Sequence, residues 1–207
     1  MWRLRGLAAS VILVAALAAC APVPQPSPTS TPTQTAVRPT PKPTPTATLP
    51  PLAIPQCEEL VPLTVAQEVF SPGVELRGET PPSEFVASLA VPAIPVVLST
   101  ASPARACRWA VPNSDGVFSL VVAGITDAER ETLRAELTAD GFAETTTGGV
   151  TAFELERDDG GLSSHGATHL FSGDAWILSD NPSLSAARAI ADAALASLRT
   201  ANPALGL

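Results

Sequence analysis

The chain has 207 residues, of which 12 are basic and 20 acidic, and its net charge at pH 7 is −8. All 20 acidic residues follow residue 55, together with 8 arginines, so residues 56–207 carry a net charge of −12. Nucleic acid and anionic lipid headgroups are bound through clustered Lys and Arg, so this balance excludes both as partners of residues 56–207. The acidity fits a negative surface that keeps the protein soluble, and capture of cations or of a basic partner is the alternative.

The first twenty residues have the pattern of an export signal. Arg3 and Arg5 precede an uncharged run at residues 7–17, which is too short to span a bilayer. The run ends in Leu17-Ala18-Ala19-Cys20, which resembles the lipobox of bacterial lipoproteins. This resemblance implies that residues 1–19 are removed as a signal peptide and that Cys20 carries a diacylglyceryl thioether. The alternative is an ordinary cleaved signal in which Cys20 occurs by chance.

Residues 20–55 are expected to form the lipid anchor and a stalk. Residues 21–55 contain twelve prolines among Thr, Ser, Gln and Ala, and no glycine. Such a composition favours polyproline II, at about 3.1 Å per residue, and cannot form a packed core. It predicts a spacer that holds a folded domain up to roughly 100 Å from the membrane. The Thr and Ser residues of the spacer are candidates for O-glycosylation.

The two remaining cysteines predict a disulfide bond. With Cys20 used for lipid, Cys57 and Cys107 form a pair in an exported and oxidising setting. A bridge that closes a loop of about 50 residues stabilises a fold by roughly 4 kcal/mol, because it removes entropy from the unfolded chain. A thiol-exchange or metal site is the alternative, but the chain has no C-x-x-C motif.

Residues 56–207 suit a single folded domain. Near its start, residues 63–70 fit a short helix that follows Pro62 and ends before Pro72. Residues 71–105 contain many prolines and are expected to be mostly loop, with a strand at residues 94–98.

The middle of the domain has clearer signals. Alternating apolar residues that begin at Cys107, a turn at residues 112–116 and an apolar run at residues 117–125 predict a β-hairpin. Thr126 and Glu129 have the spacing of a capping box and predict a helix over residues 126–140, which Gly141 ends.

The last third of the chain predicts four strands and a helix. The expected elements are a strand from Phe142, a strand at 151–157 followed by a turn at 158–161, a hairpin of strands 168–171 and 175–179, and a final helix that Asn181 and Pro182 begin. Hairpins separated by helices predict an α+β domain, with the helices packed on one face of an antiparallel sheet and one disulfide.

This combination resembles the cysteine-pair lipoproteins of actinobacteria, a family whose domain has no known function. The resemblance rests on the lipobox, the Thr/Pro-rich spacer, Cys57 just before a short helix, and Cys107-Arg108-Trp109 at the start of a hairpin. It implies a disulfide and a location in the cell envelope, and it implies no activity.

The side chains that could carry chemistry predict no catalytic, cofactor or metal site. His165 and His169 lie near Asp158, but their spacing of four places them about 13 Å apart on a strand, and a solvated turn and strand edge explains them. Ser163 and Ser164 follow glycines and lack the G-x-S-x-G motif of a nucleophile elbow. Trp109 is expected to pack on the disulfide and Trp176 to lie in the core.

These observations predict a lipoprotein anchored through Cys20 on the outer face of the cell membrane. Its domain is expected to be a non-enzymatic binding or scaffold module with an envelope protein as a possible partner. The alternatives are a cell-wall hydrolase with an unrecognised acidic pair and a solute-binding lipoprotein. The hydrolase is disfavoured by the shortage of aromatic residues for sugar stacking, and the solute-binding lipoprotein by the size of the domain.

Overall fold

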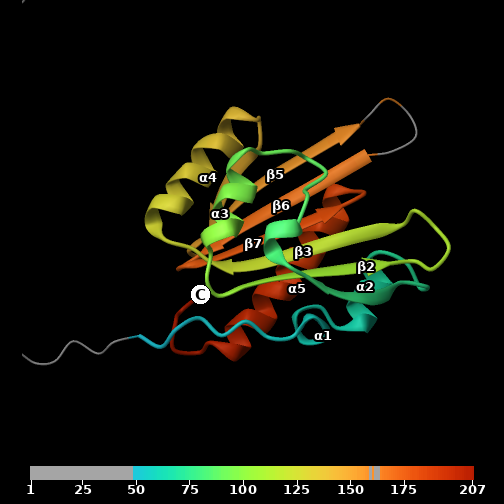
Figure 1. The fold of residues 1–207 in the computed structure, drawn as a ribbon, viewed down its shortest axis with the longest axis horizontal. Helices are drawn as coiled ribbons and strands as arrows, with labels where there is room; N and C mark the ends of the chain where they lie inside the picture. Colours follow the sequence, from blue (N-terminus) through green and yellow to red (C-terminus); the bar gives the residue numbers. More distant parts are fainter. Residues whose placement is uncertain (1–48, 159, 161–163) are drawn as a thin grey trace, which may run out of the picture. The chain divides into compact units, whose positions relative to one another are not determined.

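The structure is a computed structural model that describes residues 49–158, 160 and 164–207. Its centre is a seven-stranded antiparallel sheet with the strand order β1-β2-β3-β7-β6-β5-β4 (Figure 1). Two meanders, β1-β2-β3 and β4-β5-β6-β7, meet where β3 pairs with β7. The strands are β1 (Glu75–Thr80), β2 (Ala104–Ala110), β3 (Val117–Gly124), β4 (Ala143–Thr147), β5 (Val150–Asp158), β6 (Ser164–Ser172) and β7 (Ala175–Asn181).

Helices cover both faces of this sheet. In the described residues they are α1 (Cys57–Leu60), α2 (Leu63–Val69), the 3-10 turn η1 (Pro82–Glu84), α3 (Ala93–Thr100), α4 (Asp127–Ala139) and α5 (Leu184–Ala201). The helices α1, α2 and α5 enclose one apolar cluster and α3 and α4 enclose the other, on opposite faces (Figure 1). Along β3, Leu120 and Val122 join the first cluster, and Val121 and Ala123 join the second.

The predicted α+β class, antiparallel sheet and disulfide are confirmed, but the expectation that the helices share one face is wrong. The physical reason is the composition of the central strands. All seven residues of β7 are buried, so both of its faces need a covering layer. A single layer of helices would leave half of these apolar side chains in water.

The hairpins and the helix α4 form as the sequence predicts. The predicted hairpin at residues 107–125 is the antiparallel pair β2 and β3, in register from Ala104↔Ala123 to Ala110↔Val117. At the start of α4, the backbone N–H of Thr126 donates to Glu129 Oε2 at 2.8 Å, and the backbone N–H of Glu129 donates to Thr126 Oγ1 at 3.3 Å. This is the predicted capping box.

The proline-rich stretch at residues 71–105 differs most from its prediction. It contains β1 and α3, and the strand expected at residues 94–98 is part of the helix α3. Pro92 caps this helix and Pro95 lies in its first turn, where a missing backbone N–H costs no helical hydrogen bond. The final helix α5 also starts slightly later than expected, because Ser183 caps it by accepting from the backbone N–H of Ala186.

The disulfide between Cys57 and Cys107 joins α1 to β2, with a Cα–Cα distance of 5.7 Å. Both cysteines are buried in the cluster that α5 covers. Trp109, two residues along β2, belongs to the same cluster and stacks on Phe118 with ring centroids 4.8 Å apart. The bridge therefore ties the first helix of the domain to β2, the strand beside the edge strand β1.

The end of the predicted stalk packs on the domain. Ala53 exchanges two hydrogen bonds of 2.8 Å with the side chain of Asn202, which follows α5. Leu52 and Ile54 contact the cluster around the disulfide. The described chain therefore joins the domain beside the C-terminal end of α5.

Candidate functional site

A row of polar residues crosses the sheet beyond the edge of the α3/α4 cluster. Arg108 on β2 pairs with Ser119 on β3, and Ser119 pairs with Asp180 on β7. Paired residues of an antiparallel sheet share a face, and residues two positions apart on a strand do too. Val121 and Leu178 belong to the α3/α4 cluster, so the polar row continues the same face.

The segment after β1 folds over this row and encloses a cleft of about 760 Å³. Glu84, Phe85, Val86 and Ser88 line the cleft from this segment. The opposite wall is the polar row, together with Asp115, Val117, His165 and Pro182. A cleft of this volume is the right size for a small organic ligand.

Asp180 is the most unusual group in the cleft. Its residue is 6% exposed, and its Oδ2 accepts a hydrogen bond of 2.6 Å from the backbone N–H of Ser88. Its Oδ1 is buried and accepts no hydrogen bond within the described chain. Burial raises the pKa of the Asp180 carboxyl above its ordinary value of 3.8, against the opposing effects of the Ser88 hydrogen bond and of His165.

Carboxylates outnumber cationic side chains among the residues that line the cleft. Glu84, Asp115 and Asp180 supply three carboxylates to the lining, and Arg108 supplies one guanidinium. Glu84, Asp115 and Arg108 are exposed, so solvent screens them, whereas Asp180 lies in a less polar environment. The arrangement therefore places a buried acceptor among the residues that line the cleft.

The structure separates the two histidines into different roles. Both lie on β6, which begins earlier than the strand predicted at residues 168–171, and His165 lines the cleft. His169 is 1% exposed, which contradicts the expectation of a solvated turn for this residue. Its Nδ1 accepts a hydrogen bond of 3.2 Å from Trp176 Nε1, and burial lowers its pKa to about 3. It is a neutral core residue, and Trp176 is in the core as predicted.

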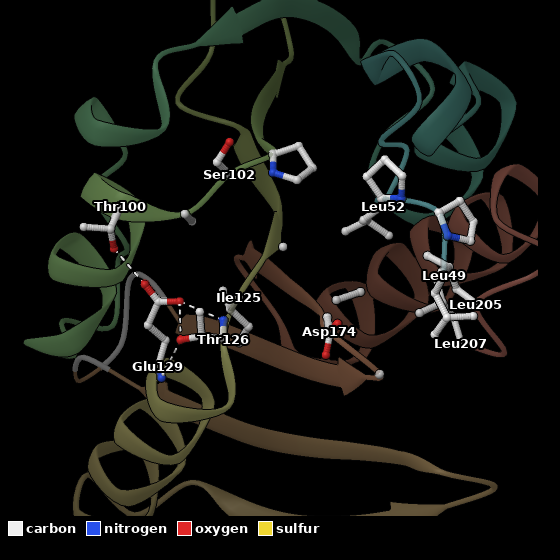
Figure 2. Close-up of a pocket in the computed structure, with 17 residues that line it drawn as sticks. Leu49, Leu52, Thr100, Ser102, Ile125, Thr126, Glu129, Asp174, Leu205 and Leu207 are labelled. Carbon is white, nitrogen blue, oxygen red and sulfur yellow. Dashed lines mark hydrogen bonds between the residues drawn. The ribbon is translucent and has the colours of Figure 1, made fainter. Parts of the chain in front are cut away.

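A second cavity, of about 580 Å³, lies beside the C-terminal residues (Figure 2). Glu129 points into it, but its carboxylate already accepts from the Thr126 backbone and from Thr100 Oγ1 at 2.7 Å. These hydrogen bonds lower the pKa of Glu129. The rest of the wall includes Leu52, Leu205 and Leu207. The carboxylate of Glu129 is therefore already used to cap the start of α4.

A third cavity lies beside α5, where Arg188 and Glu154 form an ion pair. Arg188 Nε donates to Glu154 Oε1 at 2.6 Å, and this contact raises the pKa of Arg188. Nearby, burial raises the pKa of Asp192. The carboxylate of Glu154, which is 8% exposed, is satisfied by its partner, so this cavity presents no buried acceptor in need of a donor.

The remaining predicted site residues are placed as follows. Cys57 and Cys107 are joined, while Cys20 and Ser163 lie outside the described residues. Ser164 Oγ donates to the carbonyl of Pro182 at 2.5 Å. Within residues 49–158, 160 and 164–207, no three His, Cys, Asp or Glu side chains are grouped to hold a metal ion. None of the helices in those residues is long and apolar enough to cross a bilayer.

Comparisons of the chain with protein-family models, curated proteins and solved structures gave no match. The predicted likeness to cysteine-pair lipoproteins therefore stays a prediction, and the function is argued from the residues themselves.

Proposed function

We propose that this chain is a lipid-anchored extracytoplasmic lipoprotein whose domain binds a component of the cell envelope without catalysing a reaction. The proposed location rests on Leu17-Ala18-Ala19-Cys20, which follows a charged and then an apolar segment. Two or three acyl chains on Cys20 anchor durably, because each buried methylene contributes about 0.8 kcal/mol. The proline-rich chain after Cys20 then acts as the spacer, up to the residues at 52–54 that pack on the domain.

The observation that supports a binding role is the buried carboxylate of Asp180. Asp180 is one of the residues that line the cleft, and its buried Oδ1 accepts no hydrogen bond within the described residues. Burying such an acceptor costs about 1 to 3 kcal/mol, more for a charged group, and a bound partner that donates to it recovers this cost. The sheet and the segment that covers it hold Asp180 in place, as a preorganised binding site requires.

Replacement of Cys20 by Ala is expected to abolish lipid attachment and processing, because the thiol is the acyl acceptor. The measurement is metabolic labelling with a fatty-acid probe in the expressing cells, followed by gel analysis. Cys57→Ser is the matched control, since this cysteine belongs to the disulfide and should leave labelling unchanged. Label on the Cys20→Ala protein at the wild-type level would contradict the proposed anchor.

The alternative function is a cell-wall hydrolase, and one observation favours it. Asp180 has a raised pKa and shares the cleft with Asp115 and Glu84, as an acid paired with a second carboxylate would. Turnover of purified wall fragments by the wild-type protein, lost in Asp180→Asn, would support the hydrolase. Absence of turnover with retained binding supports the binding module.

A further inference from the structure

We propose that the cleft binds a primary ammonium group attached to an apolar body, with the carboxylate of Asp180 as the partner of the ammonium. This inference rests on the proposed binding function and names the chemical class of its ligand. Three observations support it: the hydrogen bonds of Asp180, the charges of the residues that line the cleft, and the apolar residues Phe85 and Val86 in the same lining.

One oxygen of the Asp180 carboxylate has no hydrogen-bond donor within the described residues, so a bound ligand can supply one. An ionised carboxylate only accepts hydrogen bonds, and the backbone N–H of Ser88 satisfies Oδ2 alone. Oδ1 is buried and accepts none within the described residues, and Asp180 is one of the residues that line the cleft. An ammonium carries three donors and a positive charge, so it satisfies Oδ1 and compensates the buried charge together.

The charges of the residues that line the cleft also favour an ammonium ligand. The lining holds three carboxylates against one guanidinium and the imidazole of His165, so a cation is favoured in the cleft over an anion. A metal ion is a poorer fit than an ammonium, because the described residues hold no group of three or more side chains with ligating atoms. The one buried carboxylate of the lining, that of Asp180, suits a single ammonium.

The apolar part of the ligand is inferred from Phe85 and Val86. Both residues line the cleft and also line a neighbouring groove of about 270 Å³, whose other residues include Val91, Ile94 and Pro95. Val86 is 86% exposed, which is unusual for a residue of this type in the folded domain. An apolar body on the ammonium would cover Val86 and the mouth of the groove.

The experiment is calorimetric titration of the full-length lipoprotein, in a neutral maltoside detergent, with phenethylammonium. Its matched probes are 2-phenylethanol, which lacks the charge, and 3-phenylpropanoate, which reverses it. Phenethylammonium is expected to bind at least tenfold more tightly than either. Equal binding of the amine and the alcohol, or no heat from the amine at millimolar concentration, would overturn the proposed ligand class.

The diagnostic variant is Asp180→Asn, and Asp174→Asn is its control. Asn keeps an oxygen for the Ser88 N–H but removes the charge, so the affinity for phenethylammonium should fall about 10- to 100-fold. Asp174 belongs to the turn before β7 and its side chain is 86% exposed, so its replacement should leave the affinity unchanged. Equal affinity of the wild-type and Asp180→Asn proteins would contradict the assignment of Asp180.

A folding readout separates binding from structure. The melting temperature of the Asp180→Asn protein at pH 7 should equal or exceed that of the wild type, because the variant removes a buried charge. If the variant does not fold, the affinity of the wild-type protein is measured as the pH is lowered from 7 to 4. It should fall as Asp180 is protonated, and the other charged or titratable groups in the lining are Glu84, Asp115, His165 and Arg108. A pH-independent affinity would overturn the proposal.

Failure of this inference is distinguishable from failure of the binding function. Photo-crosslinking from position 119, on the wall of the cleft, is carried out in intact cells with and without Asp180→Asn. A crosslink that depends on Asp180, in a protein that does not bind phenethylammonium, would contradict only the ammonium class. Loss of both would contradict the binding function as well.

Discussion

Replacement of Cys57 by Ser is expected to lower the free energy of unfolding by about 2 to 5 kcal/mol. The bridge to Cys107 closes a loop with a sequence separation of 50, so its loss returns conformational entropy to the unfolded chain. Both cysteines are 1% exposed, so the two thiols also lose packing in the cluster that holds Trp109. A stability of 5 to 15 kcal/mol is usual for a domain, so this is a large fraction.

Denaturant unfolding of the wild type, of Cys57→Ser, of Cys107→Ser and of the double variant measures this effect. The two single variants should lose the same amount, and the double variant should lose no more, because one shared bond is removed in each case. Additive losses, or two free thiols titrated in the native oxidised protein, would contradict the bridge.

Acidification from pH 7 to pH 4 is expected to cost the folded state about 3 kcal/mol through His169 alone. Burial lowers the pKa of this imidazole from 6.5 to about 3, so the unfolded chain binds the proton first as the pH falls. The contribution of His169 to stability is therefore complete above about pH 6.5 and is lost progressively below it. The folded state resists protonation because the ring is 1% exposed and its burial disfavours the charged imidazolium.

The measurement is the free energy of unfolding as a function of pH for the wild type, for His169→Gln and for His165→Gln. The glutamine at position 169 keeps an acceptor for the Trp176 N–H, and this variant should have a flatter pH dependence while being less stable at pH 7. His165→Gln is the control from the same strand and should keep most of the slope. Identical pH slopes in the wild type and His169→Gln would show that burial does not perturb this histidine.

Local signals predict the second half of the fold well. The capping box of Thr126 and Glu129, the glycine turn at Gly173 and the alternating strands are each decided by neighbours in sequence, and each is present. Tertiary contacts decide the helix α3. Its segment is rich in β-branched residues, but Ile94, Val97 and Leu98 share a helical face that packs into the α3/α4 cluster.

The sequence contains a sign that the sheet is buried on both faces, and the prediction of helices on one face overlooks it. Residues 120–123 and 175–178 are apolar at successive positions and do not alternate with polar residues, as is typical of strands covered on both faces. The sequence of the edge strand β1 is a weaker sign of a strand, because its residues alternate only between exposed and half-buried. Its register with β2 also shifts between Leu76 and Gly78.

The cleft could not be predicted from local sequence. Asp180 lies near the end of the buried strand β7, and in the sequence it resembles an ordinary polar residue at a strand end. Its hydrogen-bond partner Ser88 is 92 residues away. Its neighbours in the polar row come from β2 and β3, which reach β7 only through the pairing of the two meanders. Three polar residues within the buried strand end, Ser179-Asp180-Asn181, are the available hint.

The central claim, that the chain works as a lipid-anchored module, is tested most directly by mass spectrometry of the N-terminal peptide of the mature protein. The account predicts a peptide that begins at Cys20 and carries the mass of a diacylglyceryl group on its sulfur, with residues 1–19 absent. A mature protein with an unmodified Cys20, or one whose first residue lies elsewhere, would contradict it.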